Sequence, residues 1–335
     1  MEKSAISSLI QKMRLGWNLG NTFDAPPGET AWHNPVTTPE MIKKIHSRGF
    51  ETLRLPVSWH CHVDEDFNVD PAFMKRVREV VDYGYDDGMY VIVNIHHDDR
   101  MFQPTREALE GGKRYLTRIW EQVSEEFRDY GERLIFETMN EPRLLRHKYE
   151  WRMDFSEPVC LEAIECVNLY NQAALDSIRR ISPDRLVMVP PCCAAARHAW
   201  IPQFRVPEDP SDRLMISIHS YDPEQLCLMP NPEATVFDKS GEEELERLMS
   251  RLDERFVQNG LPVVIGEAGI WDKNNPDERY RWAKFFTDCA KRHGMAAVWW
   301  DNGGREFKLF DRRACEFYPE HEGVVNGLLE GSSLE

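Results

Sequence analysis

Basic residues are in short supply in this chain. Its 335 residues include 41 lysines and arginines against 57 aspartates and glutamates, which gives a formal net charge of −16. A nucleic acid or an anionic membrane as main partner requires a basic surface. The charge balance therefore predicts no nucleic-acid partner and no membrane partner, and it places no constraint on an uncharged ligand.

The cysteines lack the spacing of a metal site or of a disulfide framework. Eight are present, none belongs to a CxxC pair, and Cys192 and Cys193 are adjacent, which is an awkward geometry for a mutual disulfide. We interpret most of them as reduced, small hydrophobic residues.

Targeting and membrane signals are also missing. Residues 1–3 do not begin a basic and then apolar leader, and no apolar run is long enough to span a bilayer. Residues 331–335 are typical of a vector-derived tail, so a native leader could have been removed, and we infer no cellular address from its absence.

No low-complexity tract, repeat or linker interrupts residues 1–330, which predicts one domain. Short apolar runs predict eight strands, which end near Asn18, Pro56, Asn94, Met139, Val189, Ile218, Gly266 and Trp300. Helices are predicted between most of them, over residues 39–47, 71–86, 113–128, 161–181, 242–258 and 277–292. The fifth helix is the weakest, because three prolines interrupt residues 202–210.

Eight alternating strand and helix units favour an α/β fold of the (β/α)8 TIM barrel type. A doubly wound open sheet is the alternative. That fold typically has a glycine-rich phosphate-binding loop with the motif GxGxxG after the first strand. Residues 16–21 (GWNLGN) do not match this motif.

Two glutamates follow predicted core strands. Glu141 comes after residues 134–140 (LIFETMN), and Glu267 comes after residues 261–266 (LPVVIG). A barrel enzyme keeps its catalytic groups just past the C-terminal ends of the strands. Two carboxyl groups about 5–5.5 Å apart are what retaining hydrolysis of a glycosidic bond needs. A lone glutamate in such a place is more often a surface or capping residue, so the hypothesis depends on its neighbours.

Other predicted strand ends carry polar or aromatic residues of fitting types. These are Arg54, His96, His97, His219, Tyr221, Trp300 and Asn302. Each alone has an ordinary structural explanation, as an ion-pair partner or a core residue, but a barrel brings all of them to one mouth. There Asn140 is suited to bind a sugar 2-hydroxyl, and Trp300 to form a platform under the sugar.

The neighbours predict different roles for the two carboxylates. Arg54 and the Tyr221 hydroxyl are suited to keep Glu267 ionised, since burial alone would raise the pKa of its carboxyl. Glu141 is expected to keep its proton, because a nearby ionised carboxylate and a partly apolar wall raise the pKa of an acid.

The chain resembles glycoside hydrolase family 5, a group of retaining (β/α)8 β-glycanases. The similarity lies in residues 16–22 (GWNLGNT), 34–38 (NPVTT), 88–98 (GMYVIVNIHHD), 139–143 (MNEPR) and 299–303 (WWDNG). It extends from about Gly16 to Leu309 and looks greatest for subfamily 4. That subfamily holds endo-β-1,4-glucanases, xyloglucanases and enzymes that also cut mixed-linkage glucan or xylan.

The resemblance implies that Glu141 is the acid/base and Glu267 the nucleophile. It adds residues around the cleaved sugar and residues that contact neighbouring glycone sugars: Arg54, His96, Asn140, His219, Tyr221 and Trp300 in the first group, and Asn21, His97 and Asn302 in the second. The proposed chemistry requires no metal and no organic cofactor, and none is expected. The expected substrate is a cellulose-type β-glucan, mixed-linkage glucan or xyloglucan. A monomer is expected. Secretion or a place at the cell surface is expected from a polymeric substrate.

The chain departs from its apparent relatives at Thr138, at Ala268, where a phenylalanine is usual, and in the loop after Tyr221. These departures leave the sugar preference open, so that an endo-xylanase or a mannanase on the same scaffold is an alternative. Four tryptophans could line an extended cleft: Trp32, Trp59, Trp151 and Trp271.

Two other classes of protein are also weighed. A metal-dependent barrel hydrolase would use His96, His97, His219 and Asp301. Such sites usually begin with an HxH pair at the first strand, where this chain has Trp17-Asn18. A non-catalytic carbohydrate-binding barrel would bind without turnover, and the complete catalytic set argues against it.

Overall fold

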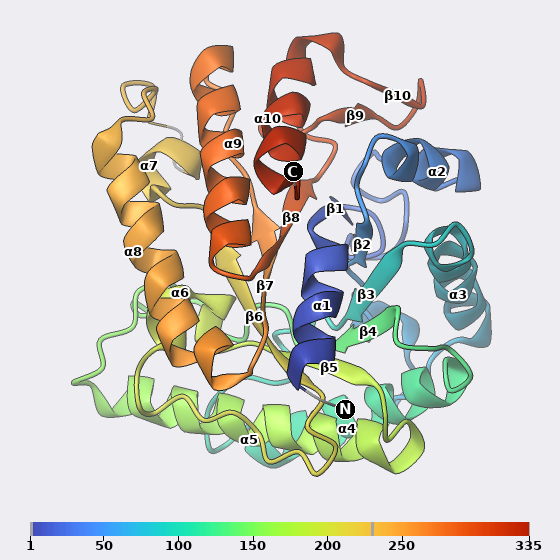
Figure 1. Cartoon of the computed structure of the whole chain (residues 1–335). Coiled ribbons are helices and arrows are strands. Elements are labelled where there is room, and N and C mark those ends of the chain that lie inside the picture. Colours follow the sequence, from blue (N-terminus) through green and yellow to red (C-terminus); the bar gives the residue numbers. More distant parts are fainter. Residues whose placement is uncertain (1–2, 229–230, 335) are drawn as a thin grey trace.

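A closed barrel of eight parallel strands forms the centre of the protein. The computed structural model describes residues 3–228 and 231–334. The strands follow one another around the barrel, and β1 pairs with both β2 and β8 (Figure 1). They are β1 (Leu15–Leu19), β2 (Thr52–Leu55), β3 (Tyr90–Asn94), β4 (Leu134–Glu137), β5 (Leu186–Val189), β6 (Leu214–Ser220), β7 (Val263–Ala268) and β8 (Ala296–Asp301). The predicted TIM barrel is confirmed and the open sheet is wrong, because the first and last strands pair.

Long helices surround the barrel, and six of them overlap the predicted ones. They are α2 (Pro39–Ser47), α3 (Pro71–Asp86), α4 (Leu109–Glu126), α5 (Pro158–Ile181), α8 (Lys239–Arg255) and α9 (Pro276–Arg292). The predicted caps of α2 and α3 are present. The side chains of Thr38 and Asp70 accept hydrogen bonds from the backbone N–H groups of Met41 and Ala72, which would otherwise lack partners.

Several elements differ from the prediction. The fifth helix is reduced to α6 (Ala196–Ala199) after a 3-10 turn at Cys192–Ala194. Elements that were not predicted are α1 (Lys3–Met13), α7 (Glu224–Cys227), a hairpin of β9 (Phe310–Asp311) and β10 (Glu316–Phe317), α10 (Glu322–Ser332), and 3-10 turns at His60–His62, Val257–Asn259 and Pro319–His321.

Helix α10 packs against α9 and continues into the segment predicted as a tail. A Cβ on Gly331 would lie 2.2 Å from the carbonyl oxygen of Lys284, so only glycine allows the two helices this approach. None of the helices in the described part of the chain has the length and apolar character needed to span a membrane.

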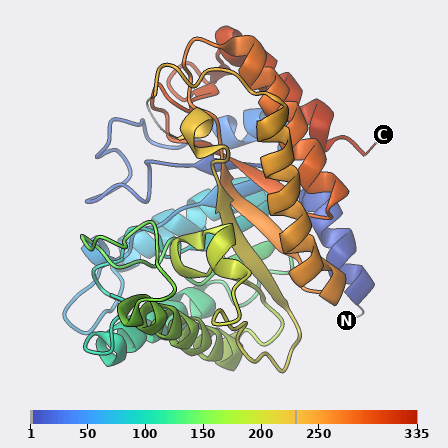
Figure 2. The ribbon, with the colours of Figure 1, turned by 90° about the vertical axis from the view of Figure 1, so that its left-hand side faces the viewer.

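An apolar plug fills the end of the barrel where the strands begin. Figure 2 shows α1 at this end and the long connecting loops at the other. Side chains of α1 join inward-facing strand residues in one buried cluster, which includes Leu9, Ile10, Met13, Ile92, Ile135, Met188, Met215, Val264 and Val298. The opposite end, where the strands finish, is left for polar side chains.

The next inward-facing layer is polar and contains a buried ion pair. Two residues after Ile135, and therefore on the same face of β4, comes Glu137. The side chains of Glu137 and Arg54 are both fully buried, and Arg54 Nη2 lies 2.7 Å from Glu137 Oε2. Asn94 and Ser217 also donate hydrogen bonds to this carboxylate. The buried charges are thus paired and hydrogen-bonded, as a low-dielectric interior requires.

The substitution Glu137→Gln tests how far the barrel depends on this pair. We expect it to lower the free energy of unfolding by about 3–5 kcal/mol, because it leaves the Arg54 charge buried with one carboxylate fewer. Urea denaturation followed by tryptophan fluorescence measures the change.

The matched control is Glu125→Gln on α4, where Glu125 pairs with the exposed Arg128 at 3.0 Å. That variant should change the free energy of unfolding by less than about 1 kcal/mol. An equally small change for Glu137→Gln would show that the buried pair contributes little.

Candidate active site

Six of the eight strands bring the predicted side chains to the open end of the barrel. A continuous set of contacts joins the eight residues expected around the cleaved sugar: Arg54, His96, Asn140, Glu141, His219, Tyr221, Glu267 and Trp300. The structure therefore brings together residues that lie up to 246 positions apart, from Arg54 to Trp300.

Glu267 is held by two hydrogen-bond donors. It lies on β7 where the pairing register with β6 shifts, so that it faces His219. Its Oε1 accepts from Arg54 Nη1 at 2.8 Å, and its Oε2 accepts from the Tyr221 hydroxyl at 2.9 Å. Burial raises the pKa of Tyr221 well above its usual value, so that this hydroxyl keeps its proton and donates. Donors aimed at both oxygens stabilise the ionised form of Glu267.

Glu141 has one close partner, His219. Its Oε1 lies 2.8 Å from His219 Nδ1, while His219 Nε2 lies 3.4 Å from Arg54 Nη2. A guanidinium group can only donate, so His219 Nε2 must accept from Arg54. The imidazole hydrogen is therefore on Nδ1, which donates it to Glu141. Around this histidine, carboxylate oxygens of Glu141 and Glu267 lie within 4.8 Å of each other. The close approach matches the separation in retaining glycosidases, about 5–5.5 Å between carboxyl groups.

The two carboxylates influence each other's ionisation. Burial raises the pKa of Glu267, and His219 and Arg54 oppose this rise only in part. Burial also acts to raise the pKa of Glu141, but the hydrogen bond from His219 and the charge of Arg143 lower it. These directions differ from the expectation that Glu141 holds the proton in the free protein. Two carboxylates this close titrate as a coupled pair. The single proton that the pair binds is therefore distributed between Glu141 and Glu267.

Asn140 and Trp300 are fixed by their neighbours. Asn140 Oδ1 accepts from Arg54 Nη2 at 2.8 Å, which leaves the amide NH₂ group for a ligand. The indole of Trp300 stacks on His96 with 5.7 Å between ring centroids and 3° between planes. Burial holds the pKa of His96 well below its usual value, so the stacked imidazole is neutral. A Cβ on Gly20 would lie 2.9 Å from the indole, so this glycine allows Trp300 to approach the first strand.

The residues expected to contact neighbouring glycone sugars lie beside the first and last strands. Of these, Asn21 and Asn302 belong to separate loops that Asn34 joins. Its side-chain amide donates to the carbonyl oxygens of Asn21 at 2.8 Å and Asn302 at 3.2 Å. His97 lies 3.7 Å from the buried carboxylate of Asp24. The loops that follow the first strand and the last strand therefore form this side of the barrel mouth.

The four residues of the metal-dependent alternative are not gathered in one place. His219 contacts the glutamate pair, whereas Asp301 accepts a hydrogen bond from a buried indole at 3.1 Å. His96 and His97 could share a cation with Asp24, since their ligand atoms lie within 4.8 Å of one another. The Asp24 carboxylate, however, already accepts two backbone N–H groups, and burial raises its pKa to about 6.

The four predicted cleft tryptophans have different positions. Trp32 and Trp151 are exposed, at 42% and 50% of their surface. The expectation for Trp59 is wrong, because its ring is fully buried and its indole N–H bonds a backbone carbonyl of the third strand. Trp271 is half-buried. Trp200, which was not predicted, lines the cleft.

Three supporting residues escaped the sequence analysis: Glu137, Asp24 and Asn34. Glu137 and Asn34 lie inside segments that were singled out for other residues, and Asp24 lies two residues beyond one of them. The signal that could have found Glu137 is its period-two spacing from the inward-facing Ile135. The roles of Asp24 and Asn34 arise from loop contacts that leave no periodic signal.

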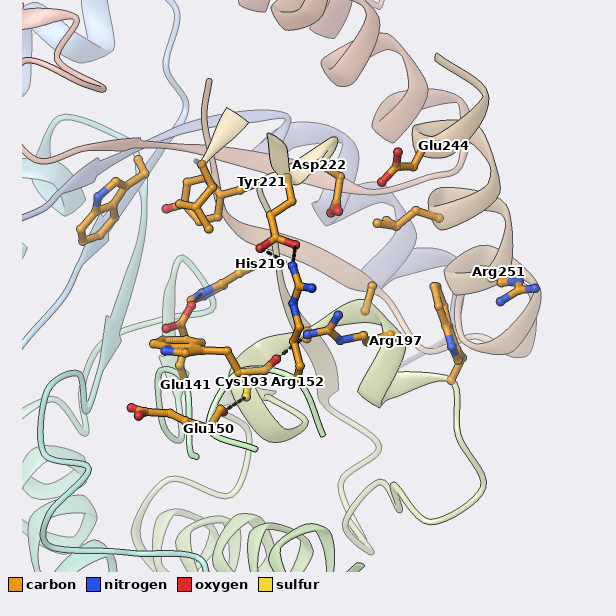
Figure 3. A pocket seen from close by; sticks show the side chains of 18 of the residues that line it. Glu141, Glu150, Arg152, Cys193, Arg197, His219, Tyr221, Asp222, Glu244 and Arg251 are labelled. Carbon is orange, nitrogen blue, oxygen red and sulfur yellow. Dashed lines mark hydrogen bonds and ion pairs between the residues drawn. The ribbon is translucent and has the colours of Figure 1, made fainter. Parts of the chain in front are cut away.

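A cleft of about 1040 Å³ opens from Glu141 and Trp300 toward α6 and α8 (Figure 3). Its other lining residues include Trp151, Trp200 and Arg251. The described residues that line this cleft do not include Asn21, His97 or Asn302. The cleft therefore extends from the Glu141 side of the site, away from the side that those three residues form.

Comparisons with known proteins agree with this geometry. Residues 18–306 match the family described as cellulase (glycosyl hydrolase family 5). Endoglucanase B of Clostridium cellulovorans is 38% identical over 319 residues, which cover 91% of this chain and 71% of that protein.

Two solved structures are similar throughout. A glycoside hydrolase 5 lichenase from Caldicellulosiruptor sp. F32, in complex with cellotetraose, superimposes with a TM-score of 0.93 at 35% identity, covering 98% of this chain and 95% of that one. A GH5-4 broad specificity endoglucanase from Clostridium acetobutylicum gives 0.90 at 34% identity, covering 96% and 98%. With its barrel, its glutamate pair and these similarities, the chain belongs to glycoside hydrolase family 5 and is most consistent with subfamily 4.

Proposed function

We propose that the protein is a retaining, endo-acting glycoside hydrolase that cleaves β-1,4-glucosidic bonds in polysaccharides. The observation that carries the proposal is the pair Glu141 and Glu267, with carboxylate oxygens within 4.8 Å at the barrel mouth and different partners for each. Cellulose-type β-glucan, mixed-linkage glucan and xyloglucan are the proposed substrates. The lichenase complex with cellotetraose supports a β-glucan, since that protein shares this fold throughout.

In the first step Glu267 attacks the anomeric carbon, and the bond from that carbon to the leaving oxygen breaks. Glu141 gives its proton to the leaving oxygen, so the aglycone departs neutral and a covalent glycosyl-enzyme forms. A chain in the cleft removes water from around Glu141, which favours its protonated form and assigns the shared proton to the acid. In the second step Glu141 takes a proton from a water molecule, whose oxygen attacks the same carbon. The bond from that carbon to Glu267 breaks, which restores the carboxylate and releases the sugar with its configuration retained.

The other site residues support the charge that develops during these steps. Arg54 and Tyr221 hold Glu267 in position, and the Asn140 amide is free to bind the sugar 2-hydroxyl as the ring becomes cationic. We assign Trp300 to a platform under the cleaved sugar. His96 supports that platform, and His219 orients Glu141.

We assign Asn21, His97 and Asn302 to the glycone sugars and the 1040 Å³ cleft to the aglycone. A chain that occupies both sides is cut internally. We further propose that residues 1–330 form one catalytic domain, that it acts as a monomer because a single chain supplies the whole site, and that it meets its polymeric substrate outside the cell.

A panel of soluble glycans tests the proposed function. Barley β-glucan, xyloglucan, hydroxyethyl cellulose, xylan and mannan are incubated with the protein, and the products are sized while NMR follows the anomer first released. We expect β-glucans to be cut internally with the β-anomer appearing first. An initial α-anomer would exclude the retaining mechanism, and hydrolysis of xylan or mannan alone would exclude the proposed substrate.

Substitution of the glutamates tests their roles. Glu141→Gln should lower kcat/KM on β-glucan by roughly 10²–10⁴-fold, because kcat/KM reports the first step, in which Glu141 is the general acid. The loss should be much smaller on an aryl β-cellobioside whose leaving group needs no proton. Glu267→Gln should abolish turnover of both substrates. Glu125→Gln on the outer surface of α4 is the control, and equal losses on both substrates for Glu141→Gln would refute its assignment as the acid.

The pH profile tests the shared proton. We expect kcat/KM to be bell-shaped, since the active state carries one proton on the pair. Activity should fall at low pH as Glu267 is protonated, and at high pH as Glu141 loses its proton. On the aryl β-cellobioside, Glu141→Gln should retain the acid limb and lose the alkaline limb. An alkaline limb that persists in this variant would identify another group as the acid.

A further inference from the structure

The half of the cleft that lies farthest from the glutamates carries several basic side chains. Its lining includes Arg197 on α6 and both Arg247 and Arg251 on α8. Figure 3 shows Arg197 and Arg251 on the side of the cleft away from Glu141. These three residues, called the arginine wall below, are all solvent-exposed.

The arginine wall lacks the carboxylate partners that a surface arginine usually has here. Another cleft residue, Arg152, is neutralised by Glu224, whose two oxygens lie 3.0 and 2.8 Å from Nη2. By contrast, Arg197 donates to a backbone carbonyl, and Arg251 lies over the indole of Trp200, 5.0 Å from its centroid. Within residues 3–228 and 231–334, no carboxylate lies within ion-pair distance of any of the three guanidinium groups.

Acidic side chains of the described residues lie near the wall without forming ion pairs with it, and they include Glu243, Glu246 and Glu254, which line a second hollow together with Arg247 and Arg251. Asp222 and Glu244 line the same part of the cleft. Asp222 accepts a hydrogen bond from the Ser220 hydroxyl at 2.8 Å. Burial raises the pKa of both carboxyl groups, although the charge of Arg197 acts to lower that of Asp222 and the charge of Arg247 that of Glu244. The wall therefore presents cationic groups to whatever fills this half of the cleft.

The protein as a whole has the opposite charge. A net charge of −16 repels an anionic polymer, so only a local arrangement can favour one. A guanidinium group presents donors in a planar fork that matches a carboxylate, and an indole face accepts a sugar ring. Arg251 lies over Trp200, and Arg197 and Arg247 line the same cleft, so both kinds of group are present in it.

We propose that the arginine wall binds carboxylate groups carried by the aglycone part of a β-glycan, such as uronate substituents, while Trp200 supports the sugar that bears them. The inference rests on the proposed function, because Glu141 protonates the leaving oxygen and thereby makes this cleft the aglycone side. It assigns to the enzyme a preference for acidic β-glycans over neutral ones of the same backbone.

The test compares two soluble derivatives of one backbone, carboxymethyl cellulose and hydroxyethyl cellulose, at matched chain length and degree of substitution. The measured quantity is the ratio of kcat/KM on the anionic polymer to kcat/KM on the neutral one, at low and high NaCl. We expect Arg197→Gln/Arg247→Gln/Arg251→Gln to lower this ratio roughly 3–10-fold at low salt. High salt should bring the wild type to the ratio of the variant, because exposed charges are screened.

Two control variants separate local recognition from general charge. Lys75→Gln/Arg114→Gln/Arg128→Gln makes the same change in net charge on α3, on α4 and just after the end of α4, and should leave the ratio close to that of the wild type. Replacing the three wall arginines by lysine keeps the charge but removes the planar fork, so the ratio should fall between those of the wild type and the glutamine variant.

The inference would be overturned if the glutamine variant of the wall kept the wild-type ratio, or if the wall and control variants lost it equally. In either case hydrolysis of hydroxyethyl cellulose would still support the proposed function. If the wild type hydrolyses neither polymer, the proposed function fails and this inference fails with it.

Discussion

A single buried guanidinium group, that of Arg54, connects the barrel to its chemistry. It lies 2.7 Å from Glu137 inside the barrel and 2.8 Å from Glu267 at the mouth, and it also donates to Asn18 and Asn140. One positive charge thus pairs with two buried carboxylates. The position of the Glu267 carboxylate depends on this guanidinium group. So does the position of the Asn140 side-chain amide, which we propose binds the sugar.

The barrel interior explains how such a charge is tolerated. The apolar plug under α1 excludes water from the end where the strands begin, and the polar layer above it supplies a partner for each buried charge. A hydrogen-bonded ion network of this kind fixes geometry more than it adds stability. For a nucleophile that must meet an anomeric carbon, fixed geometry is the more useful property.

The sequence predicted the strands and the mouth residues well, because both depend on local patterns. An apolar run followed by a polar residue is visible without knowledge of the fold, and it located Arg54, Glu141 and Glu267. Glu137 was missed because its inward direction becomes evident only when the strand register is known. Trp59 was placed wrongly because its loop turns back onto the third strand, a tertiary event without a sequence signature. The arginine wall escaped notice for the same reason, since α6 and α8 lie about 50 residues apart.

The pairing of β1 with β8 also has a consequence for the order of synthesis. A ribosome delivers Arg54 first and Glu137 next, while Glu267 and the closing strand come more than 100 residues later. The cation can therefore meet a carboxylate before the nucleophile exists. Because Asn34 links the loops after β1 and β8, the glycone side cannot be completed until the last strand has emerged. A chain released before β8 has both Arg54 and Glu137, but it lacks the residues that complete the active site.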